Sequence, residues 1–439
     1  MPLRVTVIGS GYLGVTQAAC LAEWGCEVLG VDVDAGRIAM LAEGTAPFHE
    51  PGLAELLSRH VASGKLRFTT SFLEAGAFGD VHFLCLGTPQ LRNGLGADLG
   101  QLYAAVDALT PHLHGQCLVV GKSTVPVGTA QGIAYRLSTA APANGDVDLA
   151  WNPEFLREGT AVNDTLHSDR IVIGVRSEMA EKVLREVYAA QLDEGIPMVV
   201  TDVATAELAK VAANAFLAMK LSFMNAMAEM CEATGADVIA LRDAVGRDDR
   251  IGMGYLHAGL GFGGGCLPKD IRALMAQAGD LGVERAVTLL REVDAINMSR
   301  RSRVVELTTE ACGGSVLGKQ IAVLGAAFKP DSDDIRDSPA LDVAGQLHLQ
   351  GANVSVYDPA ASANAAQALP ALRYASTPRE ASQNAHAVLH LTEWQEFREL
   401  HPRALSDVVS RKFILDGRNA LDAALWRAEG WIYRGLGRP

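Results

Sequence analysis

One stretch of the chain, residues 261–270, combines a glycine run with a cysteine and the start of a helix. Glycine has no Cβ, so the backbone of this run allows a ligand to approach closely. Cys266 precedes Pro268, which suits the first turn of a helix, and residues 271–278 are predicted to be helical. The unpaired N–H groups of that turn favour a thiolate. The stretch predicts either a nucleophile or a small buried cysteine in a turn.

The nucleophile would need more than the helix. A thiol with a pKa of about 8.5 is only about 3% ionised at neutral pH. A helix end contributes up to about 1 kcal/mol, which is less than one pKa unit. A reactive Cys266 therefore predicts a second cation nearby, either Lys269 or a lysine from elsewhere in the chain.

A second candidate site lies at the start of the chain. A predicted strand at residues 4–8 is followed by Gly-x-Gly-x-x-Gly at residues 9–14, and then by a helix that reaches Trp24. The next predicted strand, residues 27–31, ends at Asp32. A strand, glycine loop, helix, strand and acid in this order are typical of a dinucleotide-binding fold.

Each residue of that unit has an expected task. Gly9 makes the turn, Gly11 lets a pyrophosphate approach, and Gly14 packs the helix on the strand. Asp32 would bind the ribose hydroxyls and repel a 2′-phosphate, which favours NAD over NADP. Arg37 is an argument in the other direction, since a nearby arginine can accept that phosphate; otherwise it is a solvated helix residue.

Two threonines follow predicted buried strands at residues 81–86 and 118–121. Ligands of parallel sheets bind at the carboxyl ends of strands, where Thr88 and Thr124 lie. Each threonine is equally explained as a turn or N-cap residue.

Two carboxylates lie four residues apart in residues 151–159. If this turn is helical, Glu154 and Glu158 share one face, and one would act as base for water while the other contacts the cofactor. The alternative is an exposed charged turn.

A predicted helix of about thirty residues runs from residue 202 to 234 and is apolar over most of its circumference. It should be buried between layers or subunits. Lys210 and Asn214 lie at i and i+4 on one face. A lysine in so apolar a helix is costly unless it is paired or functional, and we favour function.

A second α/β unit begins near Gly318, with strands predicted at 321–324, 353–357, 387–391 and 413–415 and a helix at 338–349. Its first loop has no glycine fingerprint. Lys329, Arg336 and Arg418 lie at a predicted crevice and would suit phosphates, or form surface salt bridges.

Length and composition agree with this organisation. The chain has 439 residues, 49% of them hydrophobic and 20% charged, which is typical of a soluble globular protein of about three domains. A net charge of −13 argues against nucleic acid as a partner. We expect no signal peptide and no membrane span. We also expect no metal site, because the seven cysteines do not have the spacing of metal ligands. A reducing cytoplasmic compartment fits best.

The motifs together resemble the UDP-glucose/GDP-mannose dehydrogenase family over essentially the whole chain. The resemblance rests on residues 9–14, 123–128, 152–159, 207–214, 261–270 and 328–338. It implies two doubly wound Rossmann-like α/β domains joined by a central helical segment with one long helix. The expected boundaries are 1–197 for the NAD-binding domain, 198–300 for the central dimerisation domain, and 301–439 for the domain that binds the UDP-sugar.

The family oxidises the C6 alcohol of a nucleotide sugar twice with NAD and gives a uronic acid. The resemblance implies that Cys266 forms a thiohemiacetal and then a thioester. It implies that Lys210 and Asn214 stabilise the oxyanion, that Asp270 and Lys210 position a water which Thr124 supports, and that Glu154 is the base for hydrolysis.

The resemblance also implies two sets of binding residues. The cofactor set beyond the three fingerprint glycines is Leu13, Asp32, Arg37, Thr88, Thr124, Glu158, Lys269 and Arg336. The sugar-nucleotide set is Glu154, Phe155, Leu156, Arg157, Glu158, Lys210, Asn214, Arg250, Tyr255, Leu256, His257, Ala258, Gly259, Gly263, Lys329 and Arg418. His257 stands where some relatives have lysine, and Arg250 would reach the site of a neighbouring subunit in a homodimer or a larger homo-oligomer.

Within the family, residues 250–252, 255–256 and 263–266 look more like the UDP-glucose branch. That resemblance implies UDP-glucose as the substrate and UDP-glucuronate as the product, for polysaccharide biosynthesis. The alternatives are the same chemistry on TDP-glucose, a UDP-N-acetylhexosamine or GDP-mannose. A two-electron β-hydroxyacid dehydrogenase is a more distant alternative, since it needs neither the cysteine nor a second α/β domain. A regulator that binds nucleotides without turnover is disfavoured by the full catalytic set.

Overall fold

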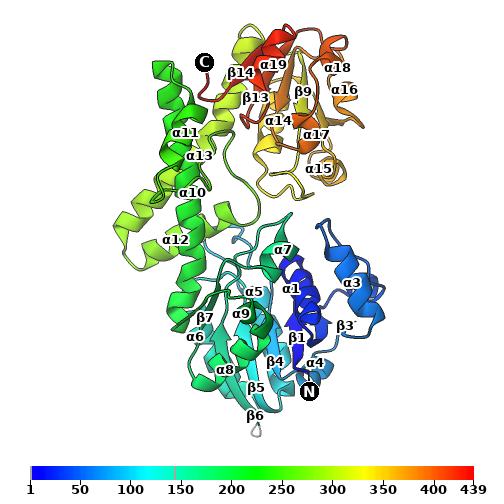
Figure 1. Ribbon diagram of the computed structural model, residues 1–439, viewed down its shortest axis with the longest axis vertical. Coiled ribbons are helices and arrows are strands. Elements are labelled where there is room, and N and C mark those ends of the chain that lie inside the picture. The colour runs from blue at the N-terminus through cyan, green and yellow to red at the C-terminus, as the bar shows by residue number, and fades with distance from the viewer. Residues whose placement is uncertain (1, 143–144) are drawn as a thin grey trace. The chain divides into compact units, whose positions relative to one another are not determined.

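The computed structural model describes residues 2–142 and 145–439, which divide into two compact units (Figure 1). Unit 1 is Met1–Ala213 and unit 2 is Asn214–Pro439. Each unit contains one sheet whose strands are mostly or entirely parallel, with helices packed against it.

Unit 1 is built on an eight-stranded sheet in the order β3-β2-β1-β4-β5-β6-β7-β8, parallel except where β6 meets β7. Its strands are β1 (Arg4–Ile8), β2 (Glu27–Val31), β3 (Leu66–Thr69), β4 (Val81–Leu84), β5 (Gly115–Gly121), β6 (Gly145–Trp151), β7 (Ile171–Gly174) and β8 (Met198–Thr201). Its helices are α1 (Tyr12–Glu23), α2 (Ala35–Ala42), α3 (Leu53–Ala62), α4 (Phe72–Phe78), α5 (Gly100–Leu109), α6 (Thr129–Ala140), α7 (Ala161–Leu166), α8 (Glu178–Val187) and α9 (Ala189–Asp193).

Successive residues of β1 face two different cores, as the period of a strand requires. Val5 and Val7 pack with residues of α1, α3 and α8, whereas Ile8 packs with residues of α4, α5 and α6. The sheet is therefore covered on both faces, which explains why its central strands are continuous apolar runs instead of alternating ones.

Unit 2 contains a six-stranded parallel sheet in the order β11-β10-β9-β12-β13-β14. Its strands are β9 (Gln320–Leu324), β10 (Asn353–Tyr357), β11 (Arg373–Tyr374), β12 (Ala387–His390), β13 (Phe413–Asp416) and β14 (Ile432–Gly435). The helices that accompany them are α14 (Pro339–Leu349), α15 (Ser362–Ala368), α16 (Pro378–Ala381), α17 (Gln395–Arg398), α18 (Arg403–Ser406) and α19 (Ala423–Ala428).

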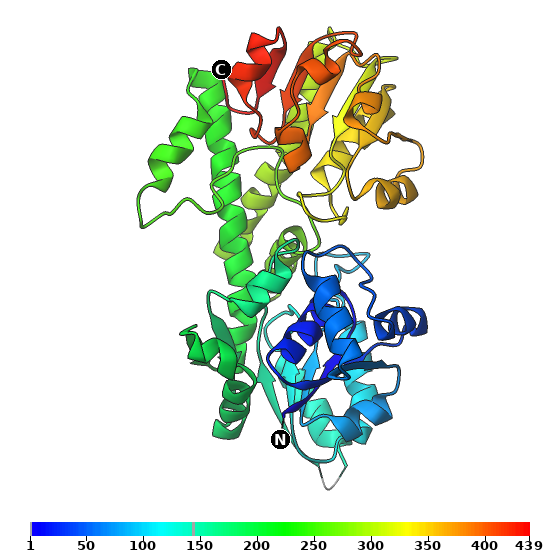
Figure 2. The same ribbon diagram turned by 45° about the vertical axis from the view of Figure 1, so that its right-hand side comes forward.

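Four further helices precede this sheet in the chain: α10 (Val203–Thr234), α11 (Val238–Gly246), α12 (Leu267–Asp280) and α13 (Glu284–Ala311). The α10 helix has 32 residues and begins in unit 1. In unit 2 it forms one small core with residues of α11 and a second with residues of α12 and α13. Figure 1 and Figure 2 show α13 running alongside the part of α10 that lies in unit 2, and the Ser222 hydroxyl of α10 donates to the Val293 carbonyl oxygen of α13 at 2.8 Å. These contacts position the loop that carries Cys266.

The α/β fold class with two parallel-sheet domains and a long central helix is confirmed. One conditional expectation is not met: residues 152–157 are irregular, so Glu154 and Glu158 do not share a helical face. The predicted strand at 81–86 also ends earlier, at Leu84. By length and composition α10 would pass as a membrane span, a test that core helices of soluble proteins also pass.

Candidate active site

The glycine fingerprint of unit 1 has the close packing that a dinucleotide loop requires. Gly9 has a φ of +97°, and a Cβ there would lie 2.7 Å from the Cys85 carbonyl oxygen. A Cβ at Gly14 would lie 1.7 Å from the Gly9 carbonyl oxygen, so only glycine lets α1 approach the loop. Nothing lies within 4 Å of a Cβ at Gly11, which leaves its surface open to a pyrophosphate. These residues fit NAD.

Asp32 is positioned at the end of β2 beside this loop. One of its oxygens accepts a hydrogen bond from the Ser10 N–H at 2.7 Å, and the other accepts from the Asp34 N–H at 3.0 Å. The Arg37 guanidinium lies 3.5 Å from the Asp32 carboxylate and 3.9 Å from that of Asp34. The structure thus places the two residues with opposing effects on 2′-phosphate binding next to each other.

The two threonines predicted at strand ends are brought together. The Thr88 hydroxyl donates a hydrogen bond to the Thr124 carbonyl oxygen at 2.6 Å. The loop after Thr124 is held by Glu207 of α10, whose buried carboxylate accepts from the Gly128 and Ala130 N–H groups, both at 2.7 Å. Burial raises the pKa of Glu207, although these two hydrogen bonds act to lower it. Glu207 thereby links α10 to the carboxyl end of β5.

One turn further along α10, Lys210 forms a buried ion pair with Glu154. The Lys210 Nζ lies 3.0 Å from a Glu154 carboxylate oxygen, and the two side chains are 5% and 11% exposed. The other Glu154 oxygen accepts from the Leu156 N–H at 2.8 Å. The predicted oxyanion-stabilising lysine and the predicted base are therefore direct neighbours, and the Phe155 ring lies 5.6 Å from the same Nζ.

The strand end before Glu154 is fixed by a buried polar network. Asn152 accepts a hydrogen bond from Lys122 at 3.0 Å and another from Tyr188 at 2.5 Å, and it donates to the Val172 carbonyl oxygen at 2.8 Å. Burial raises the pKa of Tyr188, so the phenol stays a donor at neutral pH.

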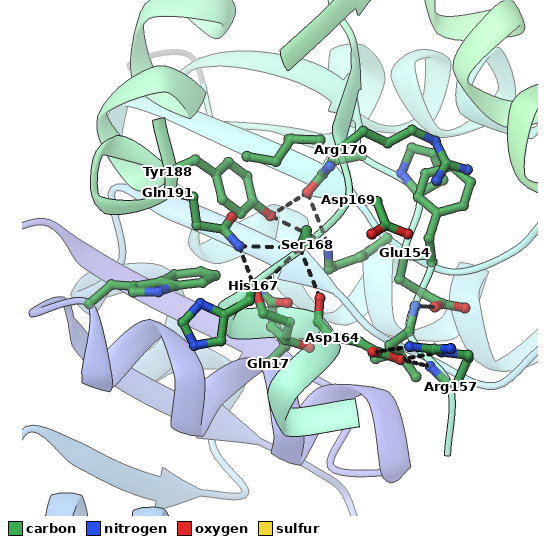
Figure 3. A pocket seen from close by; sticks show the side chains of 18 residues that line it. Gln17, Glu154, Arg157, Asp164, His167, Ser168, Asp169, Arg170, Tyr188 and Gln191 are labelled. Carbon is green, nitrogen blue, oxygen red and sulfur yellow. Dashed lines mark hydrogen bonds and ion pairs between the residues drawn. The ribbon is translucent and has the colours of Figure 1, made fainter. Parts of the chain in front are cut away.

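These side chains lie at one end of a pocket whose lining includes the predicted sugar-binding residues 154–157 (Figure 3). Figure 3 shows Glu154 and Arg157 together on one side of it, with the Arg157 guanidinium on the Asp164 carboxylate. The nearest Arg157–Asp164 approach is 2.7 Å. Arg170 lies 4.0 Å from the Phe155 ring centroid, so the loop is held by charged contacts on several sides.

In unit 2, Cys266 is the N-cap residue of α12, as the glycine run and Pro268 predict. Of the cysteines in the described chain, Cys266 alone is exposed. Burial raises the pKa of Cys20 and Cys85 to about 12 and that of Cys26 and Cys117 to about 11, which leaves those thiols unreactive. Cys266, in contrast, is exposed to solvent and lies at the start of a helix.

The next turn of α12 carries a buried carboxylate beside this cysteine. One Asp270 oxygen accepts from the Asn214 amide nitrogen at 2.6 Å, and the other lies 2.6 Å from the Lys269 Nζ. Asp270 is 1% exposed and Asn214 is 7% exposed. The structure thus brings three predicted site residues of unit 2 into one cluster.

The glycine loop before Cys266 is clamped by side chains of unit 2. The Asn297 amide accepts from the Phe262 N–H at 2.7 Å and donates to the Phe262 carbonyl oxygen at 3.0 Å. The Arg418 guanidinium donates to the carbonyl oxygens of Gly261, Leu391 and Phe328 at 2.8, 2.8 and 3.1 Å. Arg418, predicted as a phosphate ligand, here holds backbone carbonyls of three segments together.

Arg336 lies against the same loop, and Lys329 lies beside an aromatic ring that packs on it. A Cβ at Gly265 would lie 2.4 Å from the Arg336 guanidinium, so this charge packs on the residue that precedes Cys266. The Phe328 ring lies against Gly264, and Lys329 lies 5.4 Å from that ring's centroid. Arg336, which the sequence analysis assigned to the cofactor, is therefore a cation of unit 2 that lies against the residue before Cys266, and it also pairs with Asp334 at 2.7 Å.

Further predicted sugar-nucleotide residues lie in the segment 255–259 of unit 2. Tyr255 has a φ of 61°, a strained conformation for an aromatic residue that costs about 1–2 kcal/mol. The Ala258 carbonyl oxygen accepts from Asn419 at 3.1 Å, and a Cβ at Gly259 would lie 2.7 Å from the Gly417 carbonyl oxygen. Burial of the ring, followed by the charge of Arg242, lowers the pKa of His257, which is therefore neutral at pH 7.

Other predicted residues have simpler surroundings. Leu13 packs at the edge of the core on the α1 face of the sheet, and Leu256 lies in the small core between α10 and α11. Arg250 is 89% exposed and pairs with Asp248 at 2.6 Å. A Cβ at Gly263 would lie 2.2 Å from the Asp337 carbonyl oxygen. The ligand contacts assigned to these residues stay predictions.

Three domain models of one known family match successive parts of the chain. Residues 3–192 match the NAD binding domain of the UDP-glucose/GDP-mannose dehydrogenase family, residues 204–299 its central domain, and residues 322–423 its UDP binding domain. The chain is 42% identical over 439 residues to UDP-glucose 6-dehydrogenase of Rhizobium meliloti, covering 100% of both chains. It is 40% identical to UDP-glucose 6-dehydrogenase YwqF of Bacillus subtilis, covering 99% of this chain and 98% of that one.

Solved structures give the same picture. The structure of a UDP-glucose dehydrogenase from Pyrobaculum islandicum has a TM-score of 0.93 and 36% identity, and the match covers 100% of this chain and 98% of that one. A UDP-D-ManNAc dehydrogenase from Pyrococcus horikoshii has a TM-score of 0.86 and 26% identity, with 99% of each chain covered. The expectation that NAD is the cofactor is confirmed by the NAD binding domain. By sequence and by fold, this chain is an NAD-dependent dehydrogenase that belongs to the UDP-glucose/GDP-mannose dehydrogenase family.

Proposed function

We propose that this enzyme oxidises the C6 alcohol of UDP-glucose to the carboxylate of UDP-glucuronate in two NAD-dependent steps, with Cys266 as the covalent nucleophile. The observation that carries the proposal is the exposed Cys266 at the start of α12, which follows Gly265, where Arg336 packs, and precedes the buried Asp270 by one helical turn. A cysteine that merely fills space is normally buried. Bound NAD would accept one hydride from C6 in each oxidation.

In the first oxidation the C6 hydroxyl would release its proton to water and C6 would give up a hydride to NAD, which leaves an aldehyde. We assign stabilisation of the developing negative oxygen to the Lys210 ammonium and the Asn214 amide, which lie one turn apart on α10. Asp270 holds the Asn214 amide in one orientation through the 2.6 Å hydrogen bond. Because that amide is already oriented, it does not have to reorganise as the charge develops.

In the second stage the Cys266 thiolate adds to the aldehyde carbon and a thiohemiacetal forms. Loss of a second hydride from C6 converts it into a thioester. A water then attacks the carbonyl carbon, Glu154 takes a proton from that water, and the C–S bond breaks to give the carboxylate and free Cys266. The proposed reaction releases two hydrides to NAD and consumes one water for each sugar.

Similarity to the UDP-glucose 6-dehydrogenases supports UDP-glucose as the substrate. The cations Lys329 and Arg418 of unit 2 support a role for the proposed domain 301–439 in binding the sugar-nucleotide diphosphate. An NADH screen with UDP-glucose, TDP-glucose, GDP-mannose and UDP-N-acetylhexosamines tests the choice. Turnover at least about tenfold faster on another sugar nucleotide would replace UDP-glucose and leave the chemistry intact.

The exposed face of α10 supports a homodimer. Phe216, Phe223 and Met230 recur every seven residues on this helix and are 58%, 51% and 57% exposed. Large apolar side chains at this spacing form a stripe that a second helix can cover. A reducing cytoplasmic location is supported by the cysteines, which are all free in the described chain.

The Cys266→Ser variant tests the covalent mechanism. A serine hydroxyl has too high a pKa to ionise beside the same cations, so we expect release of uronic acid to fall by at least about a thousandfold. At most about one NADH per site should form, since the first oxidation does not require the thiol. Cys312→Ser, which changes a half-buried cysteine of the same unit, is the matched control. Repeated release of uronic acid by Cys266→Ser would end the covalent proposal.

A further inference from the structure

We propose that Tyr12 and Glu50 form a strut that couples NAD binding to the order of the loop at residues 154–159. Tyr12 is the first residue of α1 and directly follows Gly11 of the dinucleotide loop. Glu50 lies in the segment before α3, and neither side chain was singled out by its sequence motif. The inference concerns positioning, since neither residue is required to touch the reacting atoms.

Glu50 is 6% exposed, and its carboxylate accepts hydrogen bonds from backbone N–H groups at the end of the loop 154–159 and the start of α7. One oxygen accepts from the Gly159 N–H at 2.7 Å, and the other accepts from the Ala161 N–H at 2.7 Å and the Val162 N–H at 3.5 Å. A buried carboxylate is costly unless its oxygens are satisfied, and backbone N–H groups satisfy these. Glu50 therefore fixes where the loop ends and α7 begins.

Tyr12 completes the connection on the side of the cofactor. Its hydroxyl donates to Glu50 and accepts from the Gly159 N–H at 2.9 Å. Its ring stacks on Phe48 with a centroid distance of 4.5 Å, which limits the positions the phenol can take. Gly159 has a φ of +81°, so the turn it makes is specific to glycine.

The chemical consequence is a mechanical link between two loops far apart in sequence. Pyrophosphate binding at Gly11 orders the start of α1, and the Tyr12 hydroxyl moves with that start. Through Glu50 and Gly159 the same order extends to the loop that carries Glu154 and Glu158. This rests on the proposed function only in that Glu154 is assigned to catalysis and Glu158 to ligand binding.

Amide hydrogen exchange with NAD alone tests the strut. We expect NAD to slow exchange at residues 159–162 in the parent protein. In Tyr12→Phe this NAD-dependent slowing should fall by a factor of about 3 to 10, the usual net value of one hydrogen bond. Tyr12→Phe keeps the ring and leaves Glu50 bonded to the backbone, so the fold should be retained. Tyr135→Phe, whose ring is 71% exposed, is the control.

A double-mutant cycle on the NAD dissociation constant provides the second measurement. Tyr12→Phe and Glu50→Gln should each weaken NAD binding, and the double variant should be no weaker than the worse single one, because both remove the same connection. Glu55→Gln, an exposed glutamate of α3, is the control for charge loss.

Two outcomes would overturn the strut: NAD-dependent protection at residues 159–162 equal in Tyr12→Phe and parent, or effects on the dissociation constant that simply add. Both measurements use NAD without sugar and need no turnover. A failure here is therefore distinct from a failure of the covalent mechanism, which Cys266→Ser reports.

Discussion

Removing the Asn297 side chain should loosen the loop that carries Cys266 without affecting NAD binding. Asn297 is fully buried on α13, and its amide pairs with both the N–H and the carbonyl oxygen of Phe262. A Cβ at Gly261 would lie only 2.5 Å from the Asn297 amide oxygen, so a residue with a side chain at position 261 would clash with this amide. Asn297→Ala removes both hydrogen bonds and the packing.

The magnitude follows from the Phe262 N–H, which loses its partner, whereas the Phe262 carbonyl oxygen keeps a 3.5 Å hydrogen bond from Arg301. Phe262 is 7% exposed, so its freed N–H remains largely cut off from water. An unpaired buried group costs about 1–3 kcal/mol, so the clamped loop loses at least about 1 kcal/mol. Because about 1.4 kcal/mol corresponds to a factor of ten, kcat should fall at least about fivefold if the clamp holds Cys266 for catalysis.

Three measurements check this. We expect lower kcat, an altered rate of Cys266 alkylation by iodoacetamide, and an unchanged dissociation constant for NAD, since the dinucleotide loop belongs to unit 1. Asn297→Asp keeps the acceptor for the Phe262 N–H but sets a charge against its carbonyl oxygen, so it should not restore activity. Asn353→Ala, on an exposed strand start, is the control. A folded Asn297→Ala protein with kcat within about twofold of the parent would refute the argument.

Two further predictions concern the cofactor and the assembly. Asp32→Asn should raise the ratio of NADP to NAD efficiency at least about fivefold, because repulsion of about 1 kcal/mol or more is removed and Arg37 remains 3.5 Å away. Asp34→Asn, which keeps a good N-cap, should leave this ratio unchanged, and comparable use of both cofactors by the parent would contradict the prediction. Phe223→Glu should give a monomeric mass by light scattering at micromolar concentration. Leu349→Glu, at an 87% exposed position outside α10, should keep the mass of the parent. A mass of Phe223→Glu equal to that of the parent would rule out the α10 face as the dimer contact.

The sequence predicted helices and strands well where the local apolar pattern matches the layers that cover the element in the fold. Strand β1 and strand β2 begin and end where the apolar runs do, and the long helix is displaced by one residue at its start. The irregular segment at residues 152–157 was less predictable. Its shape is set by Asn152, Lys122 and Tyr188, which are distant in sequence and meet only in the folded core.

The site residues divide in the same way. Glycines, Asp32 and Cys266 were predictable because short-range geometry dictates them: a turn, a ribose-binding acid, a helix start. Asn297, Glu50 and Tyr12 had no such signal, since each acts on backbone groups 35 to 147 residues away. The buried face of α13 that carries Asn297 also carries Arg300 and Arg301, so the pattern of polar residues did not distinguish Asn297.

Arg418 shows why residue type alone under-determines a role. A basic side chain after a strand end suggested a phosphate ligand, and phosphate binding stays a prediction for it. In the fold its guanidinium gives hydrogen bonds to three carbonyl oxygens, one of them on the Cys266 loop. The Arg418 guanidinium therefore already holds three backbone segments in position when no ligand is bound. Glu393 lies 3.3 Å from the same guanidinium and offsets its charge, so the contacts of Arg418 support a role in holding the Cys266 loop.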